Sequence, residues 1–211
     1  MSTVHTAQFP CPACGEVVVF PVWSTLIAQE QPLQAKQLLE DGNLFEVNCP
    51  QCRGLFCSYY PLVYVDYSYP FVIKLAYDLE EHRASSPELA LYDIEIVRVV
   101  SSIEELKEKV LMIERGFDDR VLEIVKLLML MVFAAEYPGL EVKRAAYELG
   151  EQQLLRIYTT VNTVVEREMI LELYAEVKER FAAELERVSR TDYHIDQAWA
   201  QALLQRSANK R

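Results

Sequence analysis

The chain has 211 residues, of which 51% are hydrophobic and 25% charged, a composition typical of a globular protein with one large or two small domains. Its formal net charge is −11, and residues 1–68 contain only Lys36 and Arg53 as fixed positive charges. Because binding to phosphates requires clustered Lys and Arg, this balance argues against a sequence-independent nucleic-acid binder.

The N-terminal half is predicted to consist mostly of strands. The first ten residues lack the cationic and apolar regions of a targeting signal, so we expect a cytoplasmic protein. Residues 16–23 (EVVVFPVW) are β-branched and aromatic, which favours a strand. A short helix is expected at 32–39, with Pro32 in its first turn and Gly42 just beyond its end. Further strands are expected at 44–47, 55–65, 70–77 and 94–100, with a polar loop at 80–88.

Two helices are predicted next. Ser102 precedes Glu105 by three residues, which is the spacing of a capping box, and Gly116 ends the first helix. Asp118 begins the second helix, which runs to about Glu136 before the sequence Tyr-Pro-Gly.

The second of these helices is apolar on almost every side over residues 121–136 (VLEIVKLLMLMVFAAE). Such a helix must be covered on most sides, so it is either the central core helix or part of an oligomer interface. Its longest apolar run has nine residues. A bilayer span needs about 18 to 20, so no membrane contact is expected.

The last third of the chain is predicted to mix strands and helices. Residues 142–166 are rich in β-branched side chains, which favours a hairpin turning near Gly150 over a continuous helix. An amphipathic helix is expected at 170–188, and Thr191 or Asp192 caps a final helix. The apolar side of that helix comprises Tyr193, Ile195, Trp199 and Leu203. The predicted class is α+β: zinc-ribbon-like β knuckles with an inserted short helix, then an antiparallel sheet and a helical half.

The strongest chemical signal is a pair of Cys-Pro-x-Cys motifs, formed by Cys11 with Cys14 and by Cys49 with Cys52. Each motif brings two sulfurs close together, and two motifs complete a tetrahedral Zn(Cys)4 site. The alternative is a redox dithiol, whose first thiolate requires a helix N-terminus. A predicted strand follows the first motif instead, so structural zinc is favoured.

Three neighbouring residues refine this prediction. Gly15 permits a positive φ after the first motif. Arg53 replaces the glycine expected after the second, either as a tolerated positive-φ residue or as a cation beside an anionic metal centre. Cys57 is expected to be a small buried residue, with a regulatory thiol as the alternative.

These motifs suggest a family. The two Cys-Pro-x-Cys pairs, with LFEVNCPQC, YPLVYVD and the later RVVSSIEELKEKVLMIERGFDDRVLEIVK, resemble the bacterial and archaeal CpXC-domain proteins. The resemblance implies a domain over residues 8–135, a C-terminal extension over 136–211, and metal ligation by the four motif cysteines. It implies no particular reaction.

Three functional hypotheses follow. A closed metal site and an acidic composition favour a protein-interaction or oligomerisation module, with a protein partner or a homodimer. The second is an enzyme with a pocket between the metal-binding and helical parts, using Asp118, Asp119 and Arg120. The third is a thiol sensor that acts through Cys57 and zinc release.

Overall fold

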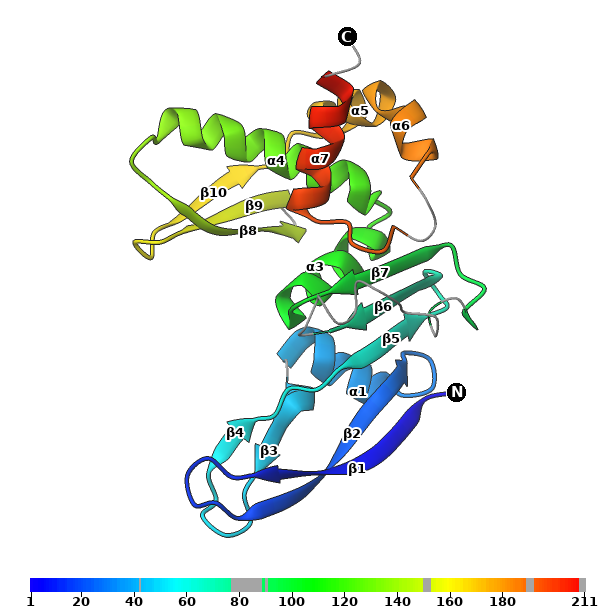
Figure 1. Ribbon diagram of the computed structural model, residues 1–211, viewed down its shortest axis with the longest axis vertical. Coiled ribbons are helices and arrows are strands. Elements are labelled where there is room, and N and C mark those ends of the chain that lie inside the picture. The colour runs from blue at the N-terminus through cyan, green and yellow to red at the C-terminus, as the bar shows by residue number, and fades with distance from the viewer. Residues whose placement is uncertain (42, 77–88, 90, 150–152, 189–191, 209–211) are drawn as a thin grey trace. The chain divides into compact units, whose positions relative to one another are not determined.

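The computed structural model describes the chain except for residues 42, 77–88, 90, 150–152, 189–191 and 209–211 (Figure 1). The predicted loop at 80–88 lies outside the described residues, as do Gly42, Gly150 and Thr191. The chain forms two compact units, Met1–Leu106 and Lys107–Arg211. Helices are mixed with antiparallel and mixed sheets, so the predicted α+β class is confirmed.

The first unit is built on a five-stranded sheet in the order β1-β2-β5-β6-β7. Its strands are β1 (Thr3–Pro10), β2 (Val17–Ile27), β5 (Leu62–Asp66), β6 (Phe71–Leu75) and β7 (Ile96–Val100). The β2–β5 and β6–β7 pairs are parallel, whereas β1–β2 and β5–β6 are antiparallel. Every residue of β5 and β6 is buried, which explains why these strands are mostly apolar, with Asp66 and Lys74 as their buried charged residues. Strand β1 was not predicted.

A short helical insertion and a second hairpin lie between β2 and β5. Helix α1 (Pro32–Lys36) continues into a π-helical turn, η1 (Gln37–Asp41), and a 3-10 turn, η2 (Asn43–Phe45), follows. Strands β3 (Glu46–Asn48) and β4 (Leu55–Cys57) then pair antiparallel. The strand predicted at 55–65 is therefore two strands that belong to different sheets.

The two predicted central helices are present as α3 (Ile103–Glu114) and α4 (Asp119–Glu136). The Oγ of Ser102 accepts a hydrogen bond from the backbone N–H of Glu105 at 3.1 Å, as the capping box predicts. Gly116 has a φ of +77°, which a glycine adopts at little cost as it ends α3. Asp118 caps α4 by accepting from the N–H of Arg120 at 3.0 Å.

The second unit contains a three-stranded antiparallel sheet in the order β10-β9-β8. Strands β8 (Val142–Leu149) and β9 (Gln153–Thr159) confirm the predicted hairpin, and β10 (Val164–Glu168) extends it. The helix predicted at 170–188 divides at Phe181 into α5 (Leu171–Arg180) and α6 (Ala182–Glu186). The final helix, α7 (Gln197–Ala208), begins later than predicted, with the Asp196 carboxylate accepting from the N–H of Trp199 at 2.8 Å.

Helix α4 contributes to two apolar clusters of the second unit, as expected for a core helix, and an oligomer interface on part of it stays a prediction. Leu122, Leu130 and Phe133 pack with residues of the β8–β10 sheet. Val121, Ile124 and Val125 pack with residues of α5, α6 and α7. Among the described residues, no helix combines the length and apolar character needed to cross a membrane.

Candidate functional site

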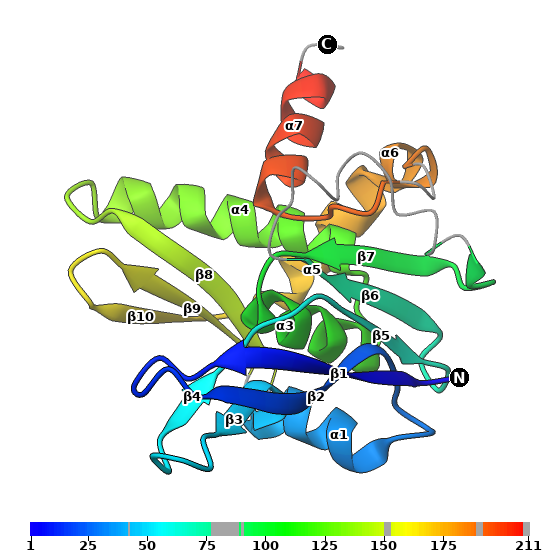
Figure 2. The same cartoon turned by 60° about the horizontal axis from the view of Figure 1, so that its bottom comes forward.

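The four motif cysteines lie in the turns of two hairpins in the first unit. Cys11 and Cys14 lie in the turn that joins β1 to β2, and Cys49 and Cys52 lie in the turn that joins β3 to β4. The two hairpin ends lie side by side in both views (Figures 1 and 2). A strand follows each motif, so the helix N-terminus that a redox dithiol requires is missing from both.

The four sulfurs are arranged for a single metal ion. All four Sγ atoms lie within 4.8 Å of one another. Across the hairpins, Cys11 Sγ lies 3.7 Å from Cys52 Sγ, and Cys14 Sγ lies 3.6 Å from Cys49 Sγ. A tetrahedral zinc with Zn–S bonds of about 2.3 Å would separate its sulfurs by about 3.8 Å. The cluster can therefore bind a tetrahedrally coordinated metal ion.

The backbone builds the two turns as copies of each other. In the first, the N–H of Cys11 donates to Glu16 O at 2.8 Å and the N–H of Gly15 donates to Cys11 O at 2.9 Å. In the second, the N–H of Cys49 donates to Gly54 O and the N–H of Arg53 donates to Cys49 O, both at 2.9 Å. Arg53 is thus the structural equivalent of Gly15.

The φ angles follow from this equivalence. Gly15 has a φ of +76°, as predicted, and Arg53 has a φ of +58°, which agrees with the first of the two alternatives given for Arg53. Arg53 adopts a conformation that disfavours residues with a Cβ. A Cβ on the neighbouring Gly54 would lie only 3.2 Å from Cys52 Sγ, so this glycine lets the backbone approach the sulfur closely.

The thiols perturb one another electrostatically. The backbone N–H of Ala13 is the main cause that lowers the pKa of Cys11 to about 7, as expected for a thiolate that accepts hydrogen bonds. At Cys14 the N–H of Glu16 lowers the pKa, but burial and the neighbouring thiols outweigh it and raise the pKa to about 12. Four thiolates at these distances repel one another, and a divalent cation removes that repulsion.

The hairpin ends have little apolar material to hold them together. Their buried cluster consists of Cys11, Val18, Val47 and Cys49, with only Phe20 and Phe56 packed partly against it. Cys14 and Cys52 are exposed. So small a cluster supplies little hydrophobic stabilisation, so a metal ion bound by the four sulfurs would be the main cross-link between the hairpins.

The prediction that Cys57 is buried was wrong, because its side chain is exposed. In the short strand β4, Phe56 packs against the buried cluster of Cys11, Val18, Val47 and Cys49. Side chains alternate along a strand, so Leu55 and Cys57 lie on the opposite face. The Cys57 thiol interacts with the Tyr59 hydroxyl and is the main cause that raises the pKa of Tyr59. A role for Cys57 in sensing stays a prediction.

The fold and this cluster define an α+β protein with two cysteine knuckles that form a single tetrathiol site. Residues 9–126 match the CpXC protein family, which covers more than half of the chain. The chain therefore belongs to the CpXC family. No curated protein and no solved structure matched the chain.

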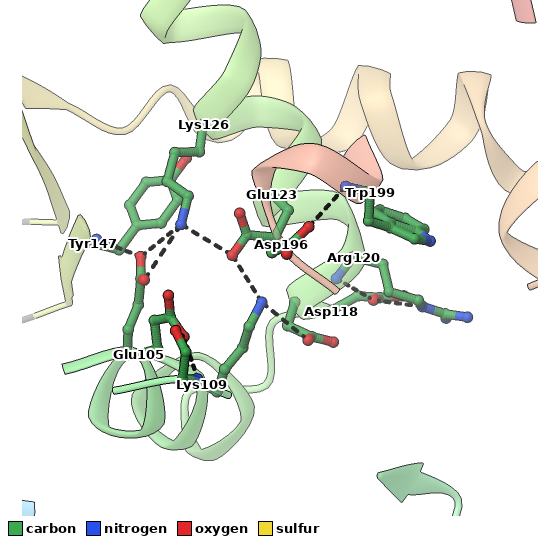
Figure 3. A network of polar contacts seen from close by, with 12 residues as sticks. Glu105, Lys109, Asp118, Arg120, Glu123, Lys126, Tyr147, Asp196 and Trp199 are labelled. Carbon is green, nitrogen blue, oxygen red and sulfur yellow. Dashed lines mark hydrogen bonds and ion pairs between the residues drawn. The ribbon is translucent and has the colours of Figure 1, made fainter. Parts of the chain in front are cut away.

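A second cluster of functional groups lies inside the second unit, where α3 faces α4 (Figure 3). Lys109 Nζ lies 2.8 Å from Glu123 Oε1 and 3.3 Å from Asp119 Oδ2. Lys126 Nζ lies 3.0 Å from Glu123 Oε1 and 3.1 Å from Glu108 Oε1. All five side chains are buried, so these charges form an internal ionic network.

Two pKa shifts show how the network is held together. Burial works to raise the pKa of Glu123, but the ammonium groups of Lys109 and Lys126 outweigh it and hold the pKa below its usual value. At Lys126 burial is likewise outweighed by Glu123 and Glu108, which raise its pKa. Each buried charge therefore depends on its partners, as desolvated ion pairs do.

The residues proposed for an enzyme pocket take part in the packing of this unit. Asp118 caps α4, and its carboxylate accepts from the Arg120 guanidinium at 2.9 and 2.7 Å. Arg120 also donates to the carbonyl of Leu185 in α6 at 3.1 Å. Asp119 is the buried partner of Lys109. Each of the three side chains stabilises a helix end or a helix contact, and an enzymatic role for them stays a prediction.

The sequence reasoning missed this buried network. None of Glu108, Lys109, Glu123 and Lys126 was among the candidate site residues. The usable signal was the i, i+4, i+7 spacing of Asp119, Glu123 and Lys126 on a helix whose other residues are apolar. Such a charged stripe on a core helix has to be buried against charges of opposite sign.

The equivalence of the two turns predicts opposite effects at one structural position. Gly15→Ala introduces a Cβ at positive φ and should lower the free energy of unfolding by about 0.5–1 kcal/mol. Arg53→Gly relieves the same strain and should raise it by a similar amount, about 0.5–1 kcal/mol. Denaturant unfolding of the metal-loaded protein measures both. If both variants changed the free energy of unfolding in the same direction, Arg53 would not carry the strain that we assign to it.

The ionic network predicts that Glu123→Gln costs about 1.5–3 kcal/mol of stability, because both buried ammonium groups lose their shared carboxylate but keep Asp119 and Glu108 as their second partners. Glu186→Gln, on an exposed residue of α6, is the matched control and should have little effect. Chemical denaturation of the full chain, followed by circular dichroism, measures the difference.

The stability difference between the wild type and Glu123→Gln should depend on pH. The pKa of Glu123 is lowered in the folded state, so its contribution is fully present above the ordinary value of 4.5 and is lost as the pH falls through the folded pKa. The stability gap between the wild type and Glu123→Gln should therefore narrow below pH 4.5. A gap that widens on acidification would show that Glu123 is not held ionised by the two lysines.

Proposed function

We propose that the chain is a zinc protein in which Cys11, Cys14, Cys49 and Cys52 hold one structural ion, and that it acts as a protein-interaction or oligomerisation module. The observation that carries the proposal is the crosswise spacing of the sulfurs, 3.6 and 3.7 Å, close to the edge of a ZnS4 tetrahedron. Zinc is favoured among thiolate-binding metals because paired knuckles with four cysteines are its usual structural site.

A structural role follows from the ligand set. Four thiolates fill a tetrahedral coordination sphere and leave no position for a water or a substrate, so the ion would not act as a Lewis acid. Its contribution would be to join the β1–β2 hairpin to the β3–β4 hairpin at a place where the buried apolar cluster is small. Function then depends on the surfaces that the cross-linked hairpins present.

A protein is the favoured partner for those surfaces. Lys36 and Arg53 are the fixed positive charges of residues 1–68, so a phosphate backbone would meet little attraction there. The same residues include exposed tyrosines, Tyr59 and Tyr67, of the kind that is enriched in protein interfaces.

Metal analysis of the purified chain tests the proposal. We expect roughly one zinc ion per chain, with no visible absorption of the kind that an iron centre would give. Cys11→Ser and Cys49→Ser remove the two buried ligands and should abolish stoichiometric binding. Cys57→Ser is the matched control and should retain the full zinc content.

Amide exchange then tests the structural role. Loss of the metal should raise exchange over residues 9–20 and 45–57, whereas the amides of β5 and β6 stay protected by their own buried core. A folded, unchanged hairpin region in the metal-free protein would contradict the proposal. Iron in place of zinc would correct the identity of the ion but not its structural role.

A further inference from the structure

The β1–β2 hairpin carries no ionisable acid or base other than His5 within its strands. Neither Thr3–Pro10 nor Val17–Ile27 contains Asp, Glu, Lys or Arg, in a chain of which 25% is charged. Strand β1 lies at the edge of the five-stranded sheet, and six of its eight residues are exposed. Proteins usually protect such edges with charges, so an uncharged edge of this length is suited to pairing with another strand.

The prolines fix which backbone groups of β1 face outward. Thr6 lies opposite Pro21, which has no N–H, so this position cannot be a hydrogen-bonded pair of the antiparallel ladder. Pro10 opposite Val17 has the same parity. Hydrogen-bonded and non-hydrogen-bonded positions alternate, so the N–H and C=O groups of Val4, Thr6 and Gln8 point away from β2, towards the open edge.

The side chains of Val4, Thr6 and Gln8 lie on one face of the hairpin, and that face is exposed and uncharged. Val4 on β1 is 49% exposed, and Val17 and Val19 on β2 are 53% and 61% exposed. Thr6, Gln8 and Pro21 lie on the same face. The open edge is therefore bordered by a weakly polar surface that a neighbouring strand can cover.

We propose that this edge binds a second copy of the chain, with the two β1 strands antiparallel about a two-fold axis at Thr6. In this register Thr6 faces Thr6 of the other copy, and Val4 faces Gln8. All three outward N–H groups of each copy then find a carbonyl. The two five-stranded sheets become one continuous sheet, which is sheet extension between identical chains.

Each of the two neighbouring registers lacks an available hydrogen-bond donor. A shift that pairs Ser2 with Gln8 needs the Ser2 N–H, which donates to the Glu30 carboxylate. A shift in the other direction pairs Val4 with Pro10, which has no N–H to donate. The register centred on Thr6 is the one whose donors are all available.

Charge favours a second copy over another occupant. The chain carries a net charge of −11, so two copies repel each other over most of their surface. The uncharged hairpin is where that repulsion is weakest. A basic peptide would be drawn to acidic surface instead, since these two strands offer it no carboxylate.

The inference rests on the proposed function, because the Cys11–Cys14 turn closes the β1–β2 hairpin and a bound ion would hold its end in place. The full-length, zinc-loaded chain is therefore the material for the test. Sedimentation over a range of concentrations should give twice the chain mass. Thr6→Lys and Thr6→Glu each place like charges opposite each other across the axis and should be monomeric. Gln37→Lys adds the same charge at an exposed position of η1 and should remain dimeric.

Mixing the two charged variants tests the register itself. Thr6→Lys and Thr6→Glu chains should form a heterodimer together, because opposite charges then meet at the axis. Thr6→Pro removes only an outward N–H and should weaken the wild-type dimer roughly tenfold or more, without loss of a hydrogen bond to β2.

The outcomes separate the two proposals. A zinc-loaded wild type that stays monomeric, a dimer that all three Thr6 variants retain, or binding of only an unrelated extended peptide would overturn the β1 contact. The proposed role of the metal would still stand in each case. A chain that dimerises through Thr6 but binds no zinc would overturn the metal proposal and leave the edge contact in place.

Discussion

Four cysteine sulfurs within 4.8 Å of one another impose the constraint on which the ends of two hairpins in the first unit depend. As thiolates they repel, as the raised pKa of Cys14 indicates, and only a cation allows all four to ionise together. The backbone conformation supports this arrangement. It repeats the same two hydrogen bonds in each turn and keeps a non-glycine residue, Arg53, in the left-handed region. The apolar cluster beside the sulfurs is too small to impose that geometry by itself.

The second unit also brings charged groups together, and it balances them with side chains of opposite sign. Its core helix α4 is covered by a sheet on one side and by helices on another, and the remaining stripe carries Asp119, Glu123 and Lys126. These charges are buried against Glu108 and Lys109 of α3. Burying charges is costly, and here each buried charge has a partner of opposite sign. In both units, groups that would be unfavourable alone fix the geometry when they are brought together.

The sequence was informative where a local rule determines the structure. Cys-x-x-Cys spacing placed the four candidate metal ligands in two turns, the capping residues located α3 and α4, and the β-branched residues indicated the β8–β9 hairpin. It failed where long-range packing decides. Cys57 looked like part of an apolar strand, but β4 is short and turns it outward. The buried charges of α4 could not be distinguished from surface ion pairs without knowing that α3 supplies their partners.

The unpredicted strand β1 runs from the edge proposed for a second copy to the first cysteine turn. Its residues, TVHTAQFP, have no strong alternation and no charges, so the sequence pattern did not distinguish a strand from an irregular end. Its order comes from pairing with β2 along its whole length and from the knuckle that follows Pro10. A strand that depends on its neighbour for order, and that exposes its other edge, would link the proposed metal site to the proposed second copy. If zinc holds the turn, its loss would loosen the turn and then strand β1, and the edge would lose the ordered backbone that a second strand requires.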